Sequence, residues 1–338
     1  GDCIDILGTG FIGGDEETEA VLVGPDYQGE LPGDIHIIHS PTSDLWGFIR
    51  ILSKTNNNED CQNIKKIQDG YEVRPLSARY KPYIQPDGSY NSQYDFVPFE
   101  KLNQLTTEEV FQIFNWMLPG NPGKHYDTEL LESVAEDGIG IGKEFQLNNL
   151  PEEIRHEVAQ FHERMVNEFD NSRYGYMIGD WMLSSHNIAD FKKDYIFRAH
   201  IAWGGVGANP IQMAIYPSHL LKTGDDVVVH FYDKPAVRTE DGGFWSISIY
   251  GLDKFIISNE IGRFGLNDRS DLVYNEDGSF DILIQKERPE GKMVNNWLPN
   301  VGKPSLIVLR FYLPTEQLLK DEWRYPEIRI AYSCAKKA

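Results

Sequence analysis

Polar side chains that could do chemistry interrupt the most apolar segments in the second half of the chain. In "LIVLRFY", the alternation of a β-strand places Arg310 and Tyr312 on one face. The same alternation places Tyr250 beside two serines in "FWSISIY", and His230 beside valine and tyrosine in "VVVHFY". An arginine within so apolar a strand must be paired or must line a water-filled cavity, because an unpaired buried charge is very unfavourable.

Two interpretations of these residues follow. In the first, Arg310 is structural and is hydrogen-bonded within a core network. In the second, Arg310, Tyr312, Tyr250 and His230 line a pocket that binds an oxygen-rich or anionic molecule. If the pocket is catalytic, we expect Tyr250, Tyr312 or His230 to act as general acid or base, while Arg310 or Arg263 holds an oxyanion. This chemistry needs no organic cofactor, and none is predicted.

The segment "CIDILGTGFIGG" has the G-x-G-x-x-G spacing of a dinucleotide-binding turn at Gly8, Gly10 and Gly13. That turn binds a pyrophosphate only where its third glycine opens a helix within a βαβ unit. Here the apolar strand "EAVLVGP" follows too soon for a crossover helix. We therefore interpret the three glycines as a turn between adjacent strands.

Metal and phosphate motifs are incomplete. His156 begins an H-E-x-x-H pattern, but Gln160 occupies the position of the second histidine. His36 and His39 would lie on opposite faces of a strand. "EDGIGIGKEF" lacks the first glycine and the hydroxyl of a P-loop. No metal site is predicted.

The elements that must position the candidate residues are mostly strands. Short β-rich segments fill the first hundred residues, namely "EAVLVGP", "GDIHIIHSP", "WGFIRIL" and "YEVRPLS", with a turn at "PDGS". From Thr106 the period becomes helical, and Glu109 completes a capping box at the start of "TTEEVFQIFNWML". Two further helices are predicted in "DTELLESVAEDG" and "LPEEIRHEVAQFHERMVNEF".

Strands return after Asp190 in "DVVVHFYD", "GFWSISIY", "SFDILIQK" and "SLIVLRFY", separated by hairpin-like turns at "EDGG" and "EDGS". We predict a mainly β (α+β) fold, in which two antiparallel jelly-roll or barrel-like β domains are joined by a helical segment. The expected boundaries are 1–104 for the N-terminal β domain, 105–189 for the helical segment and 190–338 for the C-terminal domain.

Composition excludes several classes of partner. The 338 residues carry a net charge of −20, which repels nucleic acid and anionic lipid surfaces. No apolar run is long enough to span a bilayer. Three cysteines, Cys3, Cys61 and Cys334, are too few for a disulfide scaffold, and their pairing stays open. The chain begins at Gly1 almost inside a strand, so we expect that an N-terminal segment was removed or is missing.

The C-terminal half resembles a known family. The series "FWSISIYGLDKFIISNEIGRFGLNDR", "YNEDGSFDILIQKERP", "NNWLP" and "LRFYLP…EWRYPEI" is similar to domain-of-unknown-function family 1214. The segments "VGPDYQGELPGDIHIIHSPTSDLWGFIRIL", "IQDGYEVRPLS", "NPGKHYD" and "GIGIGKEF" resemble its usual N-terminal companion, family 1254. Together the two resemblances cover almost the whole chain.

The resemblance implies an architecture rather than an activity. It implies two β domains with a helical segment between them, export from the cell, and a homo-oligomer. The residues that match the family pattern are Arg198, Trp245, Tyr250, Asn259, Arg263, Asp277, Gly278, Asn296, Trp297, Pro299, Arg310, Tyr312 and Trp323. Among them the candidate ligand-binding residues are Arg310, Arg263, Asn259, Trp245, Arg198 and Asn296.

Three functions remain open at this point. The leading hypothesis is a protein that binds or transforms a small oxygen-rich organic molecule in a pocket of the C-terminal domain, closed by the helical segment. The second is a structural or interaction protein whose aromatic surface forms an oligomer. The third is a carbohydrate-binding β module, in which Trp297 and Trp323 would stack on sugars.

Overall fold

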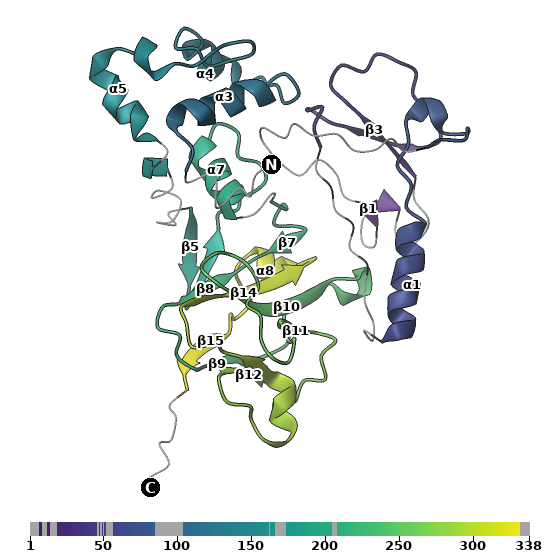
Figure 1. The fold of residues 1–338 in the computed structure, drawn as a ribbon. Coiled ribbons are helices and arrows are strands. Elements are labelled where there is room, and N and C mark those ends of the chain that lie inside the picture. Colours follow the sequence, from purple (N-terminus) through teal and green to yellow (C-terminus); the bar gives the residue numbers. More distant parts are fainter. Residues whose placement is uncertain are drawn as a thin grey trace. The chain divides into compact units, whose positions relative to one another are not determined.

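The computed structural model in Figure 1 describes most of the chain, namely residues 7–8, 12–13, 19–45, 47, 49, 51, 57–84, 104–161, 163–165, 174–204 and 208–331. The chain divides into two compact units. The first combines Gly1–Thr18 with Asn167–Ala338, and the second is Glu19–Val166. Each unit is described by itself.

The Glu19–Val166 unit begins with a short parallel pair of strands, β3 (Ala20–Val23) and β4 (His36–His39). Both strands were predicted from the sequence. Two strands joined by a short turn would be antiparallel, whereas these two are parallel. Arg79 holds the start of this unit through a bidentate pair with Glu19, with nitrogen–oxygen distances of 2.8 and 2.9 Å.

The remaining regular elements described in this unit are helices. They are α1 (Asn58–Asp69), η1 (Leu76–Ala78), α3 (Thr107–Met117), α4 (Thr128–Ser133), η3 (Leu147–Asn149) and α5 (Glu152–Ala159). The capping box predicted at α3 is present, because Thr106 and Glu109 each accept a hydrogen bond from the other's backbone N–H. Asn115 fastens α3 to the following loop through hydrogen bonds to Gly138, Gly140 and Lys143.

The strand predicted in "YEVRPLS" is absent. Residues 71–75 have no regular structure, and Leu76–Ala78 forms a 3₁₀ turn. Pro75 cannot donate to a β-ladder, and the Arg74 guanidinium draws the chain back by donating to the carbonyl oxygens of Ala78 and Lys81, both at 3.2 Å. The "PDGS" turn and most of "WGFIRIL" lie outside the described residues.

The other unit contains a seven-stranded sheet with the order β11-β10-β14-β8-β6-β5, in which β7 also pairs with β14. All of its described pairs are antiparallel. Its strands are β5 (Gly175–Ile178), β6 (Trp181–Ser184), β7 (Ala214–Ile215), β8 (Ser218–Leu221), β10 (Phe244–Tyr250), β11 (Gly265–Asn267) and β14 (Ser305–Tyr312).

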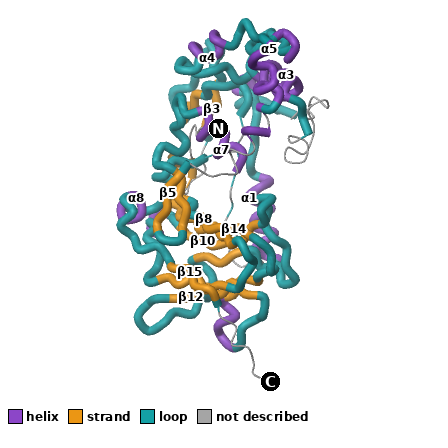
Figure 2. Tube along the Cα trace, turned by 90° about the vertical axis from the view of Figure 1, so that its left-hand side faces the viewer, coloured by secondary structure: helices purple, strands orange, loops and turns teal. Residues whose placement is uncertain are grey.

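A four-stranded sheet, in the order β13-β12-β9-β15, packs against the first (Figure 2). Its strands are β9 (Val227–Phe231), β12 (Phe280–Gln285), β13 (Trp297–Pro299) and β15 (Glu327–Ile330). Every second side chain of β9, β10, β12 and β14 points into the shared core, where the rings of Phe231 and Trp245 lie 5.4 Å apart and those of Trp245 and Phe280 5.6 Å apart. The interior between the sheets is therefore filled by apolar side chains.

Short elements complete this unit. They are β1 (Leu7–Gly8), β2 (Ile12–Gly13), α7 (Tyr195–Gly204), η4 (Thr239–Asp241), η5 (Gly291–Asn296) and α8 (Glu316–Leu319). β1 and β2 pair in parallel, and the residues between them, where a turn was expected, lie outside the described residues. Among the helices described, none is both long enough and apolar enough to cross a membrane.

The mainly β (α+β) fold is confirmed: antiparallel pairs predominate among the described strands, although β12 and β13 pair in parallel, and the strands form sandwich-like sheets without closing a barrel. The three expected domain boundaries stay a prediction. Strands β5 and β6 precede residue 190 and belong to the seven-stranded sheet, so that sheet begins within the segment expected to be helical.

Candidate functional site

Arg310 and Tyr250 interact on the outward face of the seven-stranded sheet. The Arg310 guanidinium donates a hydrogen bond of 2.5 Å to the Tyr250 hydroxyl and lies 5.1 Å from the centre of its ring. The alternation read from the sequence is confirmed, because Trp245 and its neighbours of like parity face the core while Tyr250 faces outward. Arg310 is partly buried and has no carboxylate partner among the residues that the structure describes.

Two serine hydroxyls share this face. Ser246 stands opposite Arg310 in the ladder, and Ser248 stands opposite Gly265 of β11. Neither hydroxyl has a hydrogen-bond partner within the described chain. A Cβ atom at Gly265 would lie 2.7 Å from the Ser248 hydroxyl oxygen, so the glycine leaves that hydroxyl uncovered. Gly265 was not among the residues singled out from the sequence, although a glycine in a strand indicates a close approach at this position.

Aromatic rings border the serines. Phe244 and Tyr312 stand opposite each other in the ladder and stack at 4.4 Å, while Tyr216 meets Tyr312 edge-on at 6.0 Å. Asn209 donates a hydrogen bond to the Tyr216 hydroxyl, and the Arg269 guanidinium lies 5.4 Å from the Phe244 ring. Tyr312 is thereby enclosed by other rings, whereas Tyr250 stands beside a charged group.

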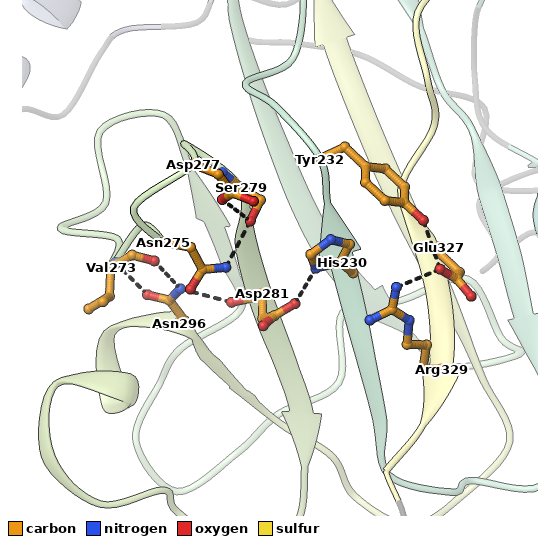
Figure 3. A network of polar contacts seen from close by, with 10 residues as sticks. All are labelled: His230, Tyr232, Val273, Asn275, Asp277, Ser279, Asp281, Asn296, Glu327 and Arg329. Carbon is orange, nitrogen blue, oxygen red and sulfur yellow. Dashed lines mark hydrogen bonds and ion pairs between the residues drawn. The ribbon is translucent and has the colours of Figure 1, made fainter.

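His230 lies on the outward face of the other sheet (Figure 3). Its Nδ1 atom is 2.7 Å from a carboxylate oxygen of Asp281 on β12, and Glu327 of β15 stands opposite it on the other side. The filled core separates this face from the one that carries Arg310. The structure therefore brings Arg310, Tyr250 and Tyr312 together but leaves His230 apart from them.

Glu327 is the most strongly perturbed carboxyl group of the His230 face. Hydrogen bonds from Arg329 at 2.6 Å and from the Tyr232 hydroxyl at 2.8 Å lower the pKa of Glu327 to about 2. Figure 3 shows these groups on one side of His230, with Asp281 on the other. No group of three or more histidine, cysteine or acidic side chains in the described residues is arranged to hold a metal ion.

The other candidate ligand-binding residues form hydrogen bonds with the backbone or lie in the core. Arg263 donates to the carbonyl oxygens of Val294 and Trp297, at 2.6 and 3.1 Å. Asn259 exchanges hydrogen bonds with the Arg263 backbone. Asn296 is fully buried and bonds only backbone atoms, and Trp245 lies in the core.

Arg198 lies on α7, away from the sheets' ladders. It donates to the carbonyl oxygen of Lys192 at 2.8 Å, and its guanidinium lies 5.6 Å from the Tyr195 ring. Trp297 and Trp323, the expected sugar platforms, are buried, and their indole nitrogens donate to Gln285 and Asp233. Neither tryptophan offers an exposed ring to a sugar.

Family comparisons agree with the paired organisation. Residues 218–316 match the model described as protein of unknown function (DUF1214), and residues 2–75 match protein of unknown function (DUF1254). The first match contains β10, β11 and β14, and hence Arg310 and Tyr250. A comparison with curated proteins found no match.

One solved structure shares the fold of this chain. The crystal structure of the VPA0106 protein from Vibrio parahaemolyticus is 19% identical over 94% of this chain and 77% of its own, with a TM-score of 0.57. A putative uncharacterized protein from Burkholderia cenocepacia is 16% identical over 52% of this chain and 42% of its own, with a TM-score of 0.31. The two family matches pair an N-terminal segment similar to DUF1254 with a C-terminal segment similar to DUF1214, and Arg310 lies within the second match.

Proposed function

We propose that the protein binds a small oxygen-rich organic anion on the outward face of β10 and β14. The proposal rests on one observation, namely that Arg310 has no carboxylate partner in the described residues. This chain has 52 acidic residues, yet in its described part none of them pairs with the Arg310 guanidinium. An arginine held on a strand without a carboxylate partner is available to an anionic ligand.

The hydrogen-bonding capacity of the face supports an acceptor-rich ligand. A guanidinium has five N–H donors, and the side-chain group that accepts from Arg310 is the Tyr250 hydroxyl. Ser246 and Ser248 add two hydroxyl donors that have no other partner in the described residues. A carboxylate presents about four lone-pair sites, which suits donors that converge from neighbouring strands.

The aromatic border supports an apolar part in the same ligand. Phe244 and Tyr312 lie two positions along the strands from Ser246 and Arg310. A carboxylate held by Arg310 therefore leaves the remainder of the ligand within reach of these rings. An aromatic carboxylate fits this combination of groups better than an inorganic anion does.

Benzoate is a suitable probe because it combines a ring with one carboxylate. We expect saturable binding of benzoate by isothermal titration calorimetry, and weaker binding by a factor of about ten or more in Arg310→Met, since a charged hydrogen bond contributes about 1.5–3 kcal/mol. Benzamide has the same shape without the charge and is expected to bind poorly. Arg288→Met, at an exposed arginine, removes the same charge elsewhere and should leave the affinity unchanged. Equal affinity in Arg310→Met and the native protein contradicts the proposal.

A second candidate function, self-association, rests on the segment between β10 and β11. Five large apolar side chains of this segment are exposed, including Leu252 at 61% and Phe255 at 62%; the others are Ile256, Ile261 and Phe264. Exposed apolar patches mark protein–protein contacts. The paired substitution Leu252→Ser with Phe255→Ser is expected to lower the mass measured by light scattering, whereas Leu220→Ser, at an exposed leucine of β8, is not. A monomeric native protein contradicts this candidate.

A further inference from the structure

Tyr176, His186 and Asp321, none of which was singled out from the sequence, converge beside the edge strand β5. The Tyr176 hydroxyl is 2.6 Å from Nε2 of His186 and donates to Asp321, whose carboxylate oxygens lie 3.0 and 3.2 Å away. Nε2 of His186 is 3.7 Å from the nearer carboxylate oxygen. His186 is exposed, so the cluster is reached from solvent.

Tyr325 has a buried and unpaired hydroxyl, and Asp321 and Tyr176 are its electrostatic neighbours in the described residues. Its ring is packed in the core against Phe311 and Trp323, and the residue is only 7% exposed. Within the described residues its hydroxyl has no hydrogen-bond partner, which is rare for a buried polar group. Burial, followed by the charge of Asp321, raises the pKa of Tyr325, so this hydroxyl stays protonated.

Asp321 is held in a strained backbone conformation. It follows α8 with a φ of 57°, in the left-handed region that residues other than glycine seldom adopt. Its backbone N–H donates to the carbonyl oxygen of Leu318, and this fixes the carboxylate beside Tyr176. A left-handed residue directly after the C-cap Lys320 ends α8, so the end of the helix sets the position of the Asp321 side chain.

The negative charge of Asp321 favours a cationic ligand at the cluster of Tyr176, His186 and Asp321. No arginine or lysine pairs with Asp321 in the part of the chain that the structure describes, and its charged-group contact there is with His186. The site therefore offers a carboxylate and a phenol oxygen, both of which accept hydrogen bonds. The negative charge of the chain as a whole also favours a cation.

We propose that Asp321, Tyr176 and Tyr325 form a binding site for the primary ammonium group of a small organic molecule. The ammonium N–H groups donate to the Asp321 carboxylate and to the Tyr325 hydroxyl oxygen, which gives the buried phenol a partner. His186 lies on the solvent-exposed side of the site. This site is separate in ligand and in residues from the anion face at Arg310.

Methylammonium chloride is the probe, and the protein is labelled with ¹³C at the ζ carbon of tyrosine. The ¹³C signals of Tyr325 and Tyr176 are assigned by their loss in Tyr325→Phe and Tyr176→Phe, respectively. We expect a saturable shift of both signals on titration, and weaker binding by a factor of about ten or more in Asp321→Asn, since a hydrogen bond to a charged group is removed. In Tyr325→Phe, followed through the Tyr176 signal, the affinity should fall about threefold to tenfold.

Matched controls separate the ammonium site from general charge effects. Tetramethylammonium has the same charge without N–H donors, and it and sodium chloride should leave both signals in place. Asn accepts a left-handed φ, so Asp321→Asn keeps the backbone, and Tyr325→Phe removes one buried oxygen without changing the ring. Arg310→Met should bind methylammonium as the native protein does, whatever its affinity for benzoate. Unsaturable shifts, equal shifts with tetramethylammonium, or an unchanged affinity in Asp321→Asn each overturn the proposal, leaving Tyr325 with a water molecule only.

Discussion

Tyr250 and Arg310 interact although they stand four positions out of register on neighbouring strands. Tyr250 lies opposite Leu306, and Arg310 lies opposite Ser246, so their backbones are separated by roughly 13 Å along the ladder. The hydrogen bond of 2.5 Å forms because both long side chains lean along the outward face. The pair therefore spans the part of the sheet that Ser248 occupies.

The first prediction contrasts two arginines. Arg263→Met is expected to lower the free energy of unfolding by about 2–3 kcal/mol, because two carbonyl oxygens lose a charged donor. Arg310→Met is expected to lower it by less than about 1.5 kcal/mol, since a single tyrosine hydroxyl loses its donor on a partly solvated face. Urea denaturation measures both values. A larger loss in Arg310→Met than in Arg263→Met would show that Arg310 is structural.

The second prediction concerns Asn296, the last residue of η5, which is fully buried and hydrogen-bonded to β12. It donates to the carbonyl oxygens of Val273 and Asp281 and accepts from the Val273 N–H, at distances of 2.8 to 2.9 Å. Asn296→Ala should lower the free energy of unfolding by about 3 kcal/mol, because buried backbone groups are left without partners. Its neighbour Asn295 makes one hydrogen bond, to Asp271, and is partly exposed. Asn295→Ala is the control, and a loss as large as that of Asn296→Ala contradicts the argument.

The third prediction is a pH dependence that originates at Glu327. Its pKa of about 2 in the folded protein lies below the ordinary value of 4.5. The unfolded chain therefore binds a proton first as the pH falls, so stability from this group is present above pH 4.5 and is lost between about pH 4.5 and 2. In Glu327→Gln, the free energy of unfolding should depend less steeply on pH between about pH 4.5 and 2. Arg329→Gln, which removes the strongest cause of the shift, should raise the pKa of Glu327 and reduce this dependence as well; chemical denaturation at several pH values measures both. If the free energy of unfolding of both variants falls with pH as steeply as that of the native protein, Glu327 is not the origin of the pH dependence.

The fourth prediction tests the start of α3. Thr106→Ala removes the side-chain oxygen that accepts from the Glu109 N–H, and should reduce the stability of this helix by about 1 kcal/mol. Hydrogen exchange of the α3 amides reports the change locally. Thr106→Ser keeps the hydroxyl and is expected to preserve protection. Faster exchange in the serine variant than in the alanine variant runs against a capping role.

Local patterns were sufficient where the backbone itself sets the period. The alternation in β10 and β14 predicted which side chains face the core, and the spacing of Thr106 and Glu109 predicted the helix start. The strand expected in "YEVRPLS" failed because Arg74 bonds carbonyl oxygens several residues further along the chain. Short β-rich segments are therefore ambiguous when a nearby side chain offers the backbone other partners.

The sequence by itself determined the classes of element, the inward and outward faces of the long strands, and the resemblance to the two families. These depend on neighbours two to four residues apart, which a linear pattern contains. Only the tertiary structure decided which polar residues meet. It placed His230 and Arg310 on opposite sides of a filled core. It also showed that Arg263, Asn259 and Asn296 form hydrogen bonds with backbone atoms. It also brought Tyr176 to Asp321, 145 residues away, because hydrogen-bond partners are chosen by packing in space rather than by distance along the chain.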